Sequence, residues 1–260
     1  MNDPHVEKLY YSVIFSSGVD FNKAPPISGE RDNFKWNLSK NQLIVKMKAH
    51  CATEIEARGM VDDFLKEWEL SIGLTHGPES ITFRYRNAEV TDRKPDLNNT
   101  GAIGLKVVAT NHVTVTSLDA VIYLSHHNFP APPQNFKISP EVDKMYMRYK
   151  RYCQGKESLL VMAYWCYTVI VDYFKGQSNA AKKLQISNKV LTKLSILSNK
   201  GDPKEARKMK GEAGSTPLSS IENKWLNTVV NVIIRRTCEY AFDPNAKLPQ
   251  ITMSDFPTIS

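Results

Sequence analysis

The sequence lacks the glycine-rich motifs with which many proteins hold nucleotides. Neither a G-x-x-x-x-G-K-[ST] loop nor a G-x-G-x-x-G turn occurs in its 260 residues. In those motifs the glycines leave backbone N–H groups open around the phosphates. Their absence counts against an NTPase or a dinucleotide-dependent enzyme, and we expect no cofactor.

Cysteines are few and far apart, and no C-x-x-C pair occurs. The four are Cys51, Cys153, Cys166 and Cys238. Three of them fall on apolar faces of predicted helices, where a reduced thiol behaves as a small hydrophobe. The pattern favours a disulfide-free, cytoplasmic protein. We expect no metal site either, because the adjacent His126 and His127 have no cysteine or pair of acids nearby to complete a ligand set.

No apolar run is long enough to cross a membrane. The most apolar stretch, residues 159–174, is shorter than the ~20 residues that span a bilayer and contains Asp172. Residues 1–7 show neither the basic nor the apolar region of a signal peptide. We therefore expect no membrane partner and no secretory leader.

What the sequence does contain is an uneven distribution of charge. From Phe136 onward it has 20 Lys and Arg against 11 Asp and Glu, a net of +9, whereas the preceding residues carry 14 against 16, a net of −2. The same point separates alternating β-branched segments from runs at helical spacing. We therefore predict two structural units, of which only the second is biased towards anions.

Residues 1–125 are predicted to form an antiparallel α+β unit with one amphipathic helix. Residues 34–38 and 43–47 alternate with period two, and the four residues between them suit a hairpin loop. The helix starts at Thr53, which has capping-box spacing to Glu56, and ends before Gly77. Further strands are expected at residues 9–15, 81–85, 88–90, 105–109, 113–116 and 120–124, and a turn-rich stretch at 24–30. Strands outnumber the helix without alternating with helices, which argues against a doubly wound fold.

The second half is predicted to be an all-α helical bundle at residues 139–243. A proline-rich linker at 126–138 precedes it, and an irregular tail at 244–260 follows it. The segment from Glu157 to Phe174 is apolar around nearly its whole circumference, so we place it at the centre of the bundle.

The other helices of the bundle are predicted from caps and apolar stripes. Ser139 begins one helix with a proline after it, Ser187 begins another, and Ser219 with Glu222 repeats the capping-box spacing. The positions expected to face inward on the last two helices are Val190, Leu191, Leu194, Leu197, Ile221, Trp225, Val229, Val232, Ile233 and Tyr240.

The candidate anion-binding residues are cations in the loop at 199–216 and near the end of the last helix. They are Lys204, Arg207, Lys208, Lys210, Arg235 and Arg236. Phosphate binding needs several cations that converge on one surface. The alternative is an ordinary solvated loop, with Arg235 and Arg236 offsetting the negative end of the helix dipole.

The order of features in this half resembles the HEPN superfamily of small helical bundles. A polar helix and a long buried helix precede Ile186-Ser187-Asn188-Lys189-Val190-Leu191, and a basic loop through Arg207 leads to a helix that bears Trp225. The resemblance implies a bacterial protein of toxin or antiviral defence. Many such proteins are ribonucleases with an R-x4-6-H motif, yet this chain has no histidine after His127. The N-terminal half resembles the leading part of bacterial proteins without an assigned activity.

The sequence therefore favours a non-catalytic protein whose basic helical domain contacts nucleic acid, RNA before DNA, or an acidic partner. Two alternatives stay open. One is a histidine-free ribonuclease that acts through Arg207, Lys208 and Glu212. The other is an assembly protein that forms homodimers through the face of its bundle.

Overall fold

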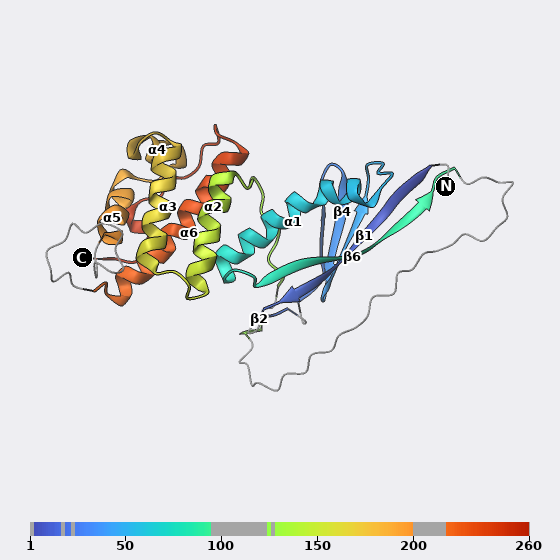
Figure 1. Cartoon of the computed structure of the whole chain (residues 1–260), viewed down its shortest axis with the longest axis horizontal. Coiled ribbons are helices and arrows are strands. Elements are labelled where there is room, and N and C mark those ends of the chain that lie inside the picture. The colour runs from blue at the N-terminus through green and yellow to red at the C-terminus, as the bar shows by residue number, and fades with distance from the viewer. Residues whose placement is uncertain are drawn as a thin grey trace. The chain divides into compact units, whose positions relative to one another are not determined.

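A computed structural model of the chain describes residues 3–16, 19–21, 24–94, 124–125, 128–199 and 217–259. They fall into two compact units, Met1–Pro132 and Pro133–Ser260. The first is built on an antiparallel sheet with one long helix, and the second on helices (Figure 1). The chain is therefore α+β in class, as the sequence predicts.

Five strands of the first unit form a sheet in the order β3-β4-β5-β1-β6, in which every neighbouring pair is antiparallel. Two short strands, β2 and β7, pair in parallel outside it. The strands are β1 (Pro4–Phe15), β2 (Val19–Asp20), β3 (Ile27–Glu30), β4 (Phe34–Ser39), β5 (Gln42–Met47), β6 (Ile81–Asp92) and β7 (Leu124–Ser125).

One face of this sheet is covered by helix α1 (Glu54–His76). Alternate residues of β4 and β5 are buried, which is the period-two pattern of a strand with one face on the core. Trp68 of α1 is fully buried, and its ring centroid lies 5.0 Å from those of Trp36 and Phe83. The expected hairpin is confirmed, with Ser39 paired to Gln42 across a two-residue turn.

The ends of α1 follow the local signals in the sequence. The Thr53 hydroxyl accepts from the Glu56 N–H at 3.2 Å, while the Glu56 carboxylate reaches back to the Ala52 N–H at 2.9 Å. Gly77 ends the helix with φ 97°, a conformation that favours glycine.

Two features of the sheet differ from the sequence-based expectations. Residues 27–30 lie in the stretch predicted as turn-rich but form edge strand β3, which pairs with β4. The two strands expected at 81–85 and 88–90 are one strand, β6, whose pairing with β1 contains two register shifts. The strands expected at 105–109 and 113–116 lie outside the described residues, and of the one expected at 120–124 only Leu124 is described.

The predicted linker contains the boundary between the two units but is anchored at both ends. Phe129 stacks on Phe21 at 5.5 Å between ring centroids, and the Trp68 Nε1–H donates to the carbonyl oxygen of Pro130 at 2.9 Å. Phe136 is buried within the second unit. Only a short part of 126–138 therefore connects the units.

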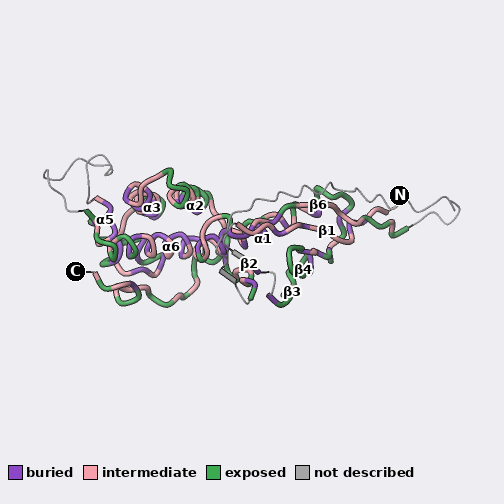
Figure 2. The backbone as a smooth tube through the Cα atoms, turned by 90° about the horizontal axis from the view of Figure 1, so that it is seen from below, coloured by how far each residue is buried: buried purple, intermediate pink, exposed green. Residues whose placement is uncertain are grey.

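The second unit is a bundle of five described helices. They are α2 (Pro140–Cys153), α3 (Leu159–Tyr173), α4 (Gln177–Leu184), α5 (Asn188–Ser198) and α6 (Ser220–Phe242). Helix α3 contacts each of the other four, but so does α6, so the central place predicted for α3 is shared between these two helices. The long helix α6 is buried along much of its length (Figure 2).

The caps and most of the inward positions of the bundle agree with the sequence. Ser139 caps α2, and Ser219 and Glu222 form a complete capping box on α6. Ser187 occupies the N-cap position of α5 but makes no side-chain capping bond. Of the inward positions listed from the sequence, seven are buried, Val232 and Tyr240 are half-buried, and Ile221 is exposed, so the prediction for Ile221 was wrong.

The tail after α6 has little regular structure, as expected, but it lies back on the bundle. Ile251 and Ile186 form a parallel bridge, in which Ser187 N–H donates to Ile251 and Ile251 N–H to Gln185, both at 2.8 Å. Phe256, after the short 3-10 turn η1 (Met253–Asp255), is buried against Trp225. No helix within the described residues has the length and apolar character to cross a membrane.

Candidate functional site

Only two of the six predicted anion-binding residues lie in the described part of the chain. Lys204, Arg207, Lys208 and Lys210 belong to residues 200–216, which lie outside it. Arg235 and Arg236 are on α6, and their surroundings differ from the open cationic surface that was expected.

Arg236 is a structural residue in this fold. It is only 8% exposed, its Nη1 pairs with Glu239 Oε2 at 3.1 Å, and its Nη2 donates to the carbonyl oxygen of Pro249 at 2.7 Å. Arg235 is half-buried and also engaged within the protein. The guanidinium of Arg236 is therefore committed to the tail and to a neighbouring acid, so it offers little to an external phosphate.

Another cationic surface lies on α4 and α5, which follow one another across a three-residue turn. Gln185 opens this turn in the left-handed conformation, with φ 52° and ψ 45°. Its side-chain Nε2 donates to the carbonyl oxygen of Lys182 at 2.7 Å. Ile186, the middle residue of the turn, is buried, so the turn is anchored to the core of the bundle.

The two helices bury one side each and expose lysines on the other. The buried side chains are Ala180, Ala181 and Leu184 of α4 and Val190, Leu191, Leu194 and Leu197 of α5. Lys182, Lys183 and Lys189 are exposed, and Lys193 is half-exposed. No Asp or Glu occurs anywhere between Asp172 and Asp202. The two helices themselves therefore contain no acidic side chain.

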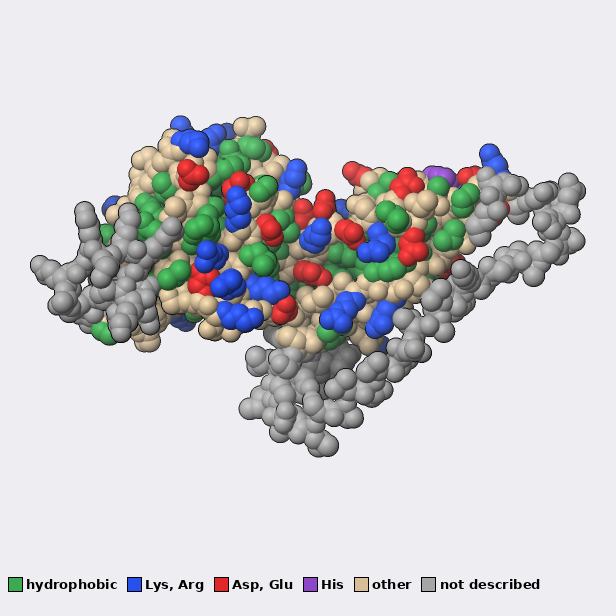
Figure 3. Space-filling model, in the orientation of Figure 1, with side chains coloured by type: hydrophobic (Ala, Val, Ile, Leu, Met, Phe, Trp, Pro, Cys, Tyr) green, Lys and Arg blue, Asp and Glu red, His purple; other side chains and the backbone are tan. Residues whose placement is uncertain are grey.

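A hollow of about 520 Å³ lies between α4 and the start of the tail. Its polar lining consists of three lysines and three amides: Lys182, Lys183, Lys247, Asn179, Gln185 and Asn245. None of the residues that line it is acidic. Figure 3 shows Lys or Arg side chains over α4 at the top of the helical unit. Three ammonium groups and three amides around one hollow can donate many hydrogen bonds to an anion.

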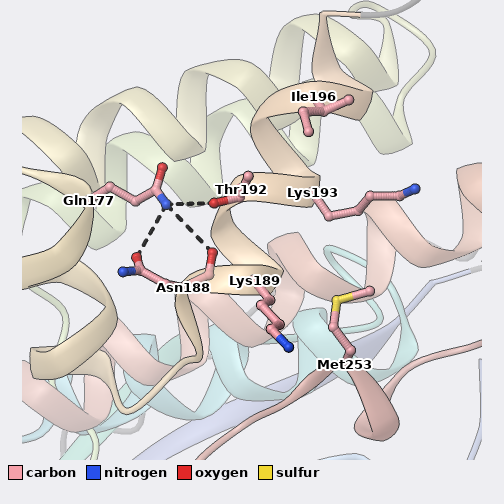
Figure 4. A pocket seen from close by; sticks show the side chains of 7 residues that line it. All are labelled: Gln177, Asn188, Lys189, Thr192, Lys193, Ile196 and Met253. Atoms are coloured by element: carbon pink, nitrogen blue, oxygen red, sulfur yellow. Dashed lines mark hydrogen bonds between the residues drawn. The ribbon is translucent and has the colours of Figure 1, made fainter.

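A second, shallower groove of about 450 Å³ runs along the exposed side of α5. Its lining includes Asn188, Lys189, Thr192, Lys193 and Ile196 of α5, at the spacing of one helical face. Met253 of the tail and Gln177 of α4 complete the lining (Figure 4). This groove, too, has no acidic lining residue.

Gln177 holds two residues of this groove in place. Its Nε2 donates to Thr192 Oγ1 at 2.9 Å and to Asn188 Oδ1 at 3.2 Å (Figure 4). Its own Oε1 accepts from the Tyr167 hydroxyl of α3 at 2.8 Å. A chain of hydrogen bonds thus runs from the central helix to the exposed face of α5.

A cluster of titratable side chains in the first unit lies around His5. The His5 ring is buried and stacks on His50 at 5.4 Å between centroids, and its Nδ1 accepts from the Cys51 N–H at 3.4 Å. Burial raises the pKa of the Cys51 thiol, which makes it a weak nucleophile. Within the described residues, no three His, Cys, Asp or Glu side chains are placed to hold a metal ion. The cluster therefore gives no sign of an active site.

Comparison with known proteins adds no function to this geometry. No protein-family model matches the chain, and no curated protein or solved structure matches it either. The resemblance to the HEPN superfamily therefore stays a prediction. The candidate site rests on the chemistry of α4, α5 and the tail alone.

Sequence reasoning missed this surface, although a signal for it was present. Residues 173–201 contain six lysines and no acid, the longest such imbalance in the basic half. The cations of residues 200–216 are more closely spaced, but Asp202, Glu205 and Glu212 lie among them. The absence of acids from residues 173–201 is therefore the sequence signal that marks α4 and α5.

Proposed function

We propose that the helical unit is a nucleic-acid-binding module and that the surface of α4, α5 and the first part of the tail is its contact surface. The observation that carries the proposal is a lysine surface whose two hollows have no acidic lining residue; its lysines are Lys182, Lys183, Lys189, Lys193 and Lys247. The function is one of binding and does not require turnover.

The charge of the whole unit supports a polyanionic partner. Its described residues from Pro133 onward contain 15 Lys and Arg against 8 Asp and Glu, a net of +7. The acids lie outside α4 and α5. Glu157 pairs with Arg148 and Arg151 at one end of α2, and Glu239 pairs with Arg236 on α6. The excess positive charge therefore concentrates on α4 and α5.

Nucleic acid suits this surface better than a small anion. The lysines are spread over two helices and the tail and line more than one hollow. A chain of phosphates can contact all of them together, whereas one small anion can contact only a few. Each phosphate that a lysine neutralises releases a condensed counterion, so binding should weaken steeply with salt.

The test measures the affinity of the full chain for a labelled DNA duplex of about 20 base pairs, or two helical turns, by fluorescence anisotropy. The double variant Lys182→Ala/Lys183→Ala should bind roughly tenfold or more weakly at about 0.1 M salt. Its slope of log K against log salt should be shallower by about 1.8, which is about 0.9 per lost contact.

A matched control separates this surface from net charge. Lys144→Ala/Lys156→Ala also removes two exposed lysines, but these lie beside Glu141, Asp143 and Glu157 in the sequence. It should keep its affinity to within about twofold. Equal losses in the two double variants, or no salt-dependent binding by the unaltered chain, would remove the proposed function.

A further inference from the structure

Helices α4 and α5 have the layout of a DNA-reading helix pair. An eight-residue helix is joined by the three-residue turn 185–187 to an eleven-residue helix, and both are fastened to the bundle by apolar side chains. In helix-turn-helix proteins the second helix of such a pair enters the major groove while the first crosses the phosphate backbone. Helix α4 contacts α5 directly, and its Ala180 and Ala181 are buried within the bundle.

We propose that α5 is a recognition helix that reads base pairs in the major groove of duplex DNA, and that α4 contacts the flanking phosphates. This inference rests on the proposed function and deepens it, since it names the partner as B-form DNA and assigns a separate role to each helix. The lysines of α4 supply affinity, and the uncharged residues of α5, together with Lys189, supply sequence preference.

The exposed face of α5 has the donors, acceptors and apolar groups that base edges require. Asn188 can pair with adenine N6 and N7, Lys189 can donate to guanine O6 and N7, and Ile196 can contact a thymine methyl group. Ile196 is 54% exposed, so its side chain is accessible to such a contact. In helix-turn-helix complexes the residues near the start of the second helix, here Asn188 and Lys189, contact the base edges.

Gln177 makes this face rigid before DNA arrives. Its Nε2 holds Thr192 and Asn188, and the Tyr167 hydroxyl holds Gln177. A side chain that already occupies one rotamer loses less entropy on binding. Gln177 is thus a positioning residue, because it acts on the bases through Asn188 and Thr192.

Helix α4 presents a different chemistry, suited to the backbone. Its exposed residues, Ser178, Asn179, Lys182 and Lys183, are phosphate donors that carry no base information. A duplex of RNA is a poor fit for the pair, since its deep and narrow major groove does not admit a helix. The observations therefore favour DNA over RNA.

The experiment selects bound sequences from a pool of randomised duplex DNA with the full chain. We expect an enriched motif, with the selected duplex bound about 5- to 100-fold more tightly than a scrambled one. Duplex RNA of the same sequence should bind no better than scrambled DNA.

Two variants that leave the net charge unchanged separate the preference for a sequence from the overall affinity for DNA. Asn188→Ala/Thr192→Ala should lose most of the preference for the selected sequence, while its affinity for scrambled DNA stays within about twofold. Gln177→Ala should weaken the preference in the same direction by a smaller factor. The control Asn223→Ala/Thr228→Ala, on α6, should change neither quantity.

The outcomes distinguish the inference from the function on which it rests. Salt-dependent binding without any enriched motif, or equal binding of duplex RNA, overturns the recognition helix and leaves a non-specific nucleic-acid-binding surface. A preference that survives in Asn188→Ala/Thr192→Ala overturns it as well. Absence of binding to every nucleic acid removes both proposals.

Discussion

Arg236 reaches out of α6 to the tail, where its Nη2 donates to the carbonyl oxygen of Pro249 at 2.7 Å. The same guanidinium pairs with Glu239, so one buried cation joins the tail at Pro249 to the helix before it. The tail supplies Lys247 to the hollow beside α4 and Met253 to the groove along α5. This contact therefore supports the candidate surface without belonging to it.

Replacing this arginine should destabilise the helical unit. Arg236→Ala leaves a carbonyl oxygen and a carboxylate without their donor, and we expect a loss of about 2–3 kcal/mol in the free energy of unfolding. Urea denaturation followed by circular dichroism measures the change. Lys224→Ala, an exposed position on the same helix, should stay within about 0.5 kcal/mol of the unaltered chain. Equal stability of the two variants would contradict the role given to Arg236.

A glycine in the first unit should be equally sensitive, for a steric reason. Gly29 of β3 is paired with Trp36 of β4, and a methyl group added to it would lie 2.7 Å from the indole ring. That ring packs on Trp68, so Gly29→Ala should cost about 1–3 kcal/mol. The control is Gly59→Ala on α1, where an added methyl meets nothing within 4 Å. It should stabilise the chain by about 0.5–1 kcal/mol, and thermal unfolding should show opposite shifts for the two alanines.

The sequence predicted those parts of the fold that depend on neighbouring residues. Caps at Thr53, Ser139 and Ser219 need only a hydroxyl and a donor three positions away, so they are visible in the sequence. Period-two alternation likewise located β4 and β5. Strand β3 was missed because Pro25-Pro26 and Gly29 are typical of turns, whereas its strand geometry comes from pairing with β4.

The candidate site was less predictable because it depends on contacts between distant residues. Helix α4 is short and rich in Ser, Asn and Gln, so its pattern is weak, and its alanines become informative only when seen buried. The sequence placed Arg236 among free cations, since nothing local shows that Pro249 returns to it. The tail's supply of Lys247 to the hollow beside α4 is likewise a long-range relationship.

The buried imidazole of His5 should make the first unit sensitive to acid. Burial, together with the nearby cation of Arg93, lowers the pKa of His5 below its ordinary value of about 6.5, against opposing contributions from Glu7 and Asp3, while His50 also lowers it. The unfolded chain therefore binds this proton more readily than the folded one. Stability is fully present above about pH 6.5 and is lost as the pH falls through the lowered pKa.

The measurement is the urea midpoint of the first unit between about pH 7.5 and pH 5. We expect His5→Gln to show a smaller decline over this range than the unaltered chain, even if its stability at neutral pH is lower. Parallel curves for His5→Gln and the unaltered chain would show that another group is responsible.

The turn between α4 and α5 gives the last prediction, because Gln185 adopts a left-handed conformation that glycine tolerates best. Gln185→Val should destabilise the chain by about 2 kcal/mol, since a β-branched residue is strained there and the bond to the Lys182 carbonyl is lost. Gln185→Gly relieves the strain while it gains entropy in the unfolded state, so it should lie within about 1 kcal/mol of the unaltered chain.

Position-matched controls make this ordering informative. Gln154→Val, at the end of α2 where φ is an ordinary −83°, should cost less than Gln185→Val in the same thermal unfolding measurement. Because Gln185→Gly keeps the left-handed turn and so the orientation of α5, it should retain the DNA sequence preference of the unaltered chain. Equal stability of Gln185→Val and Gln185→Gly would mean that the turn is not held in the left-handed region. The orientation of α5, on which the proposed reading of bases depends, would then not be fixed by this turn.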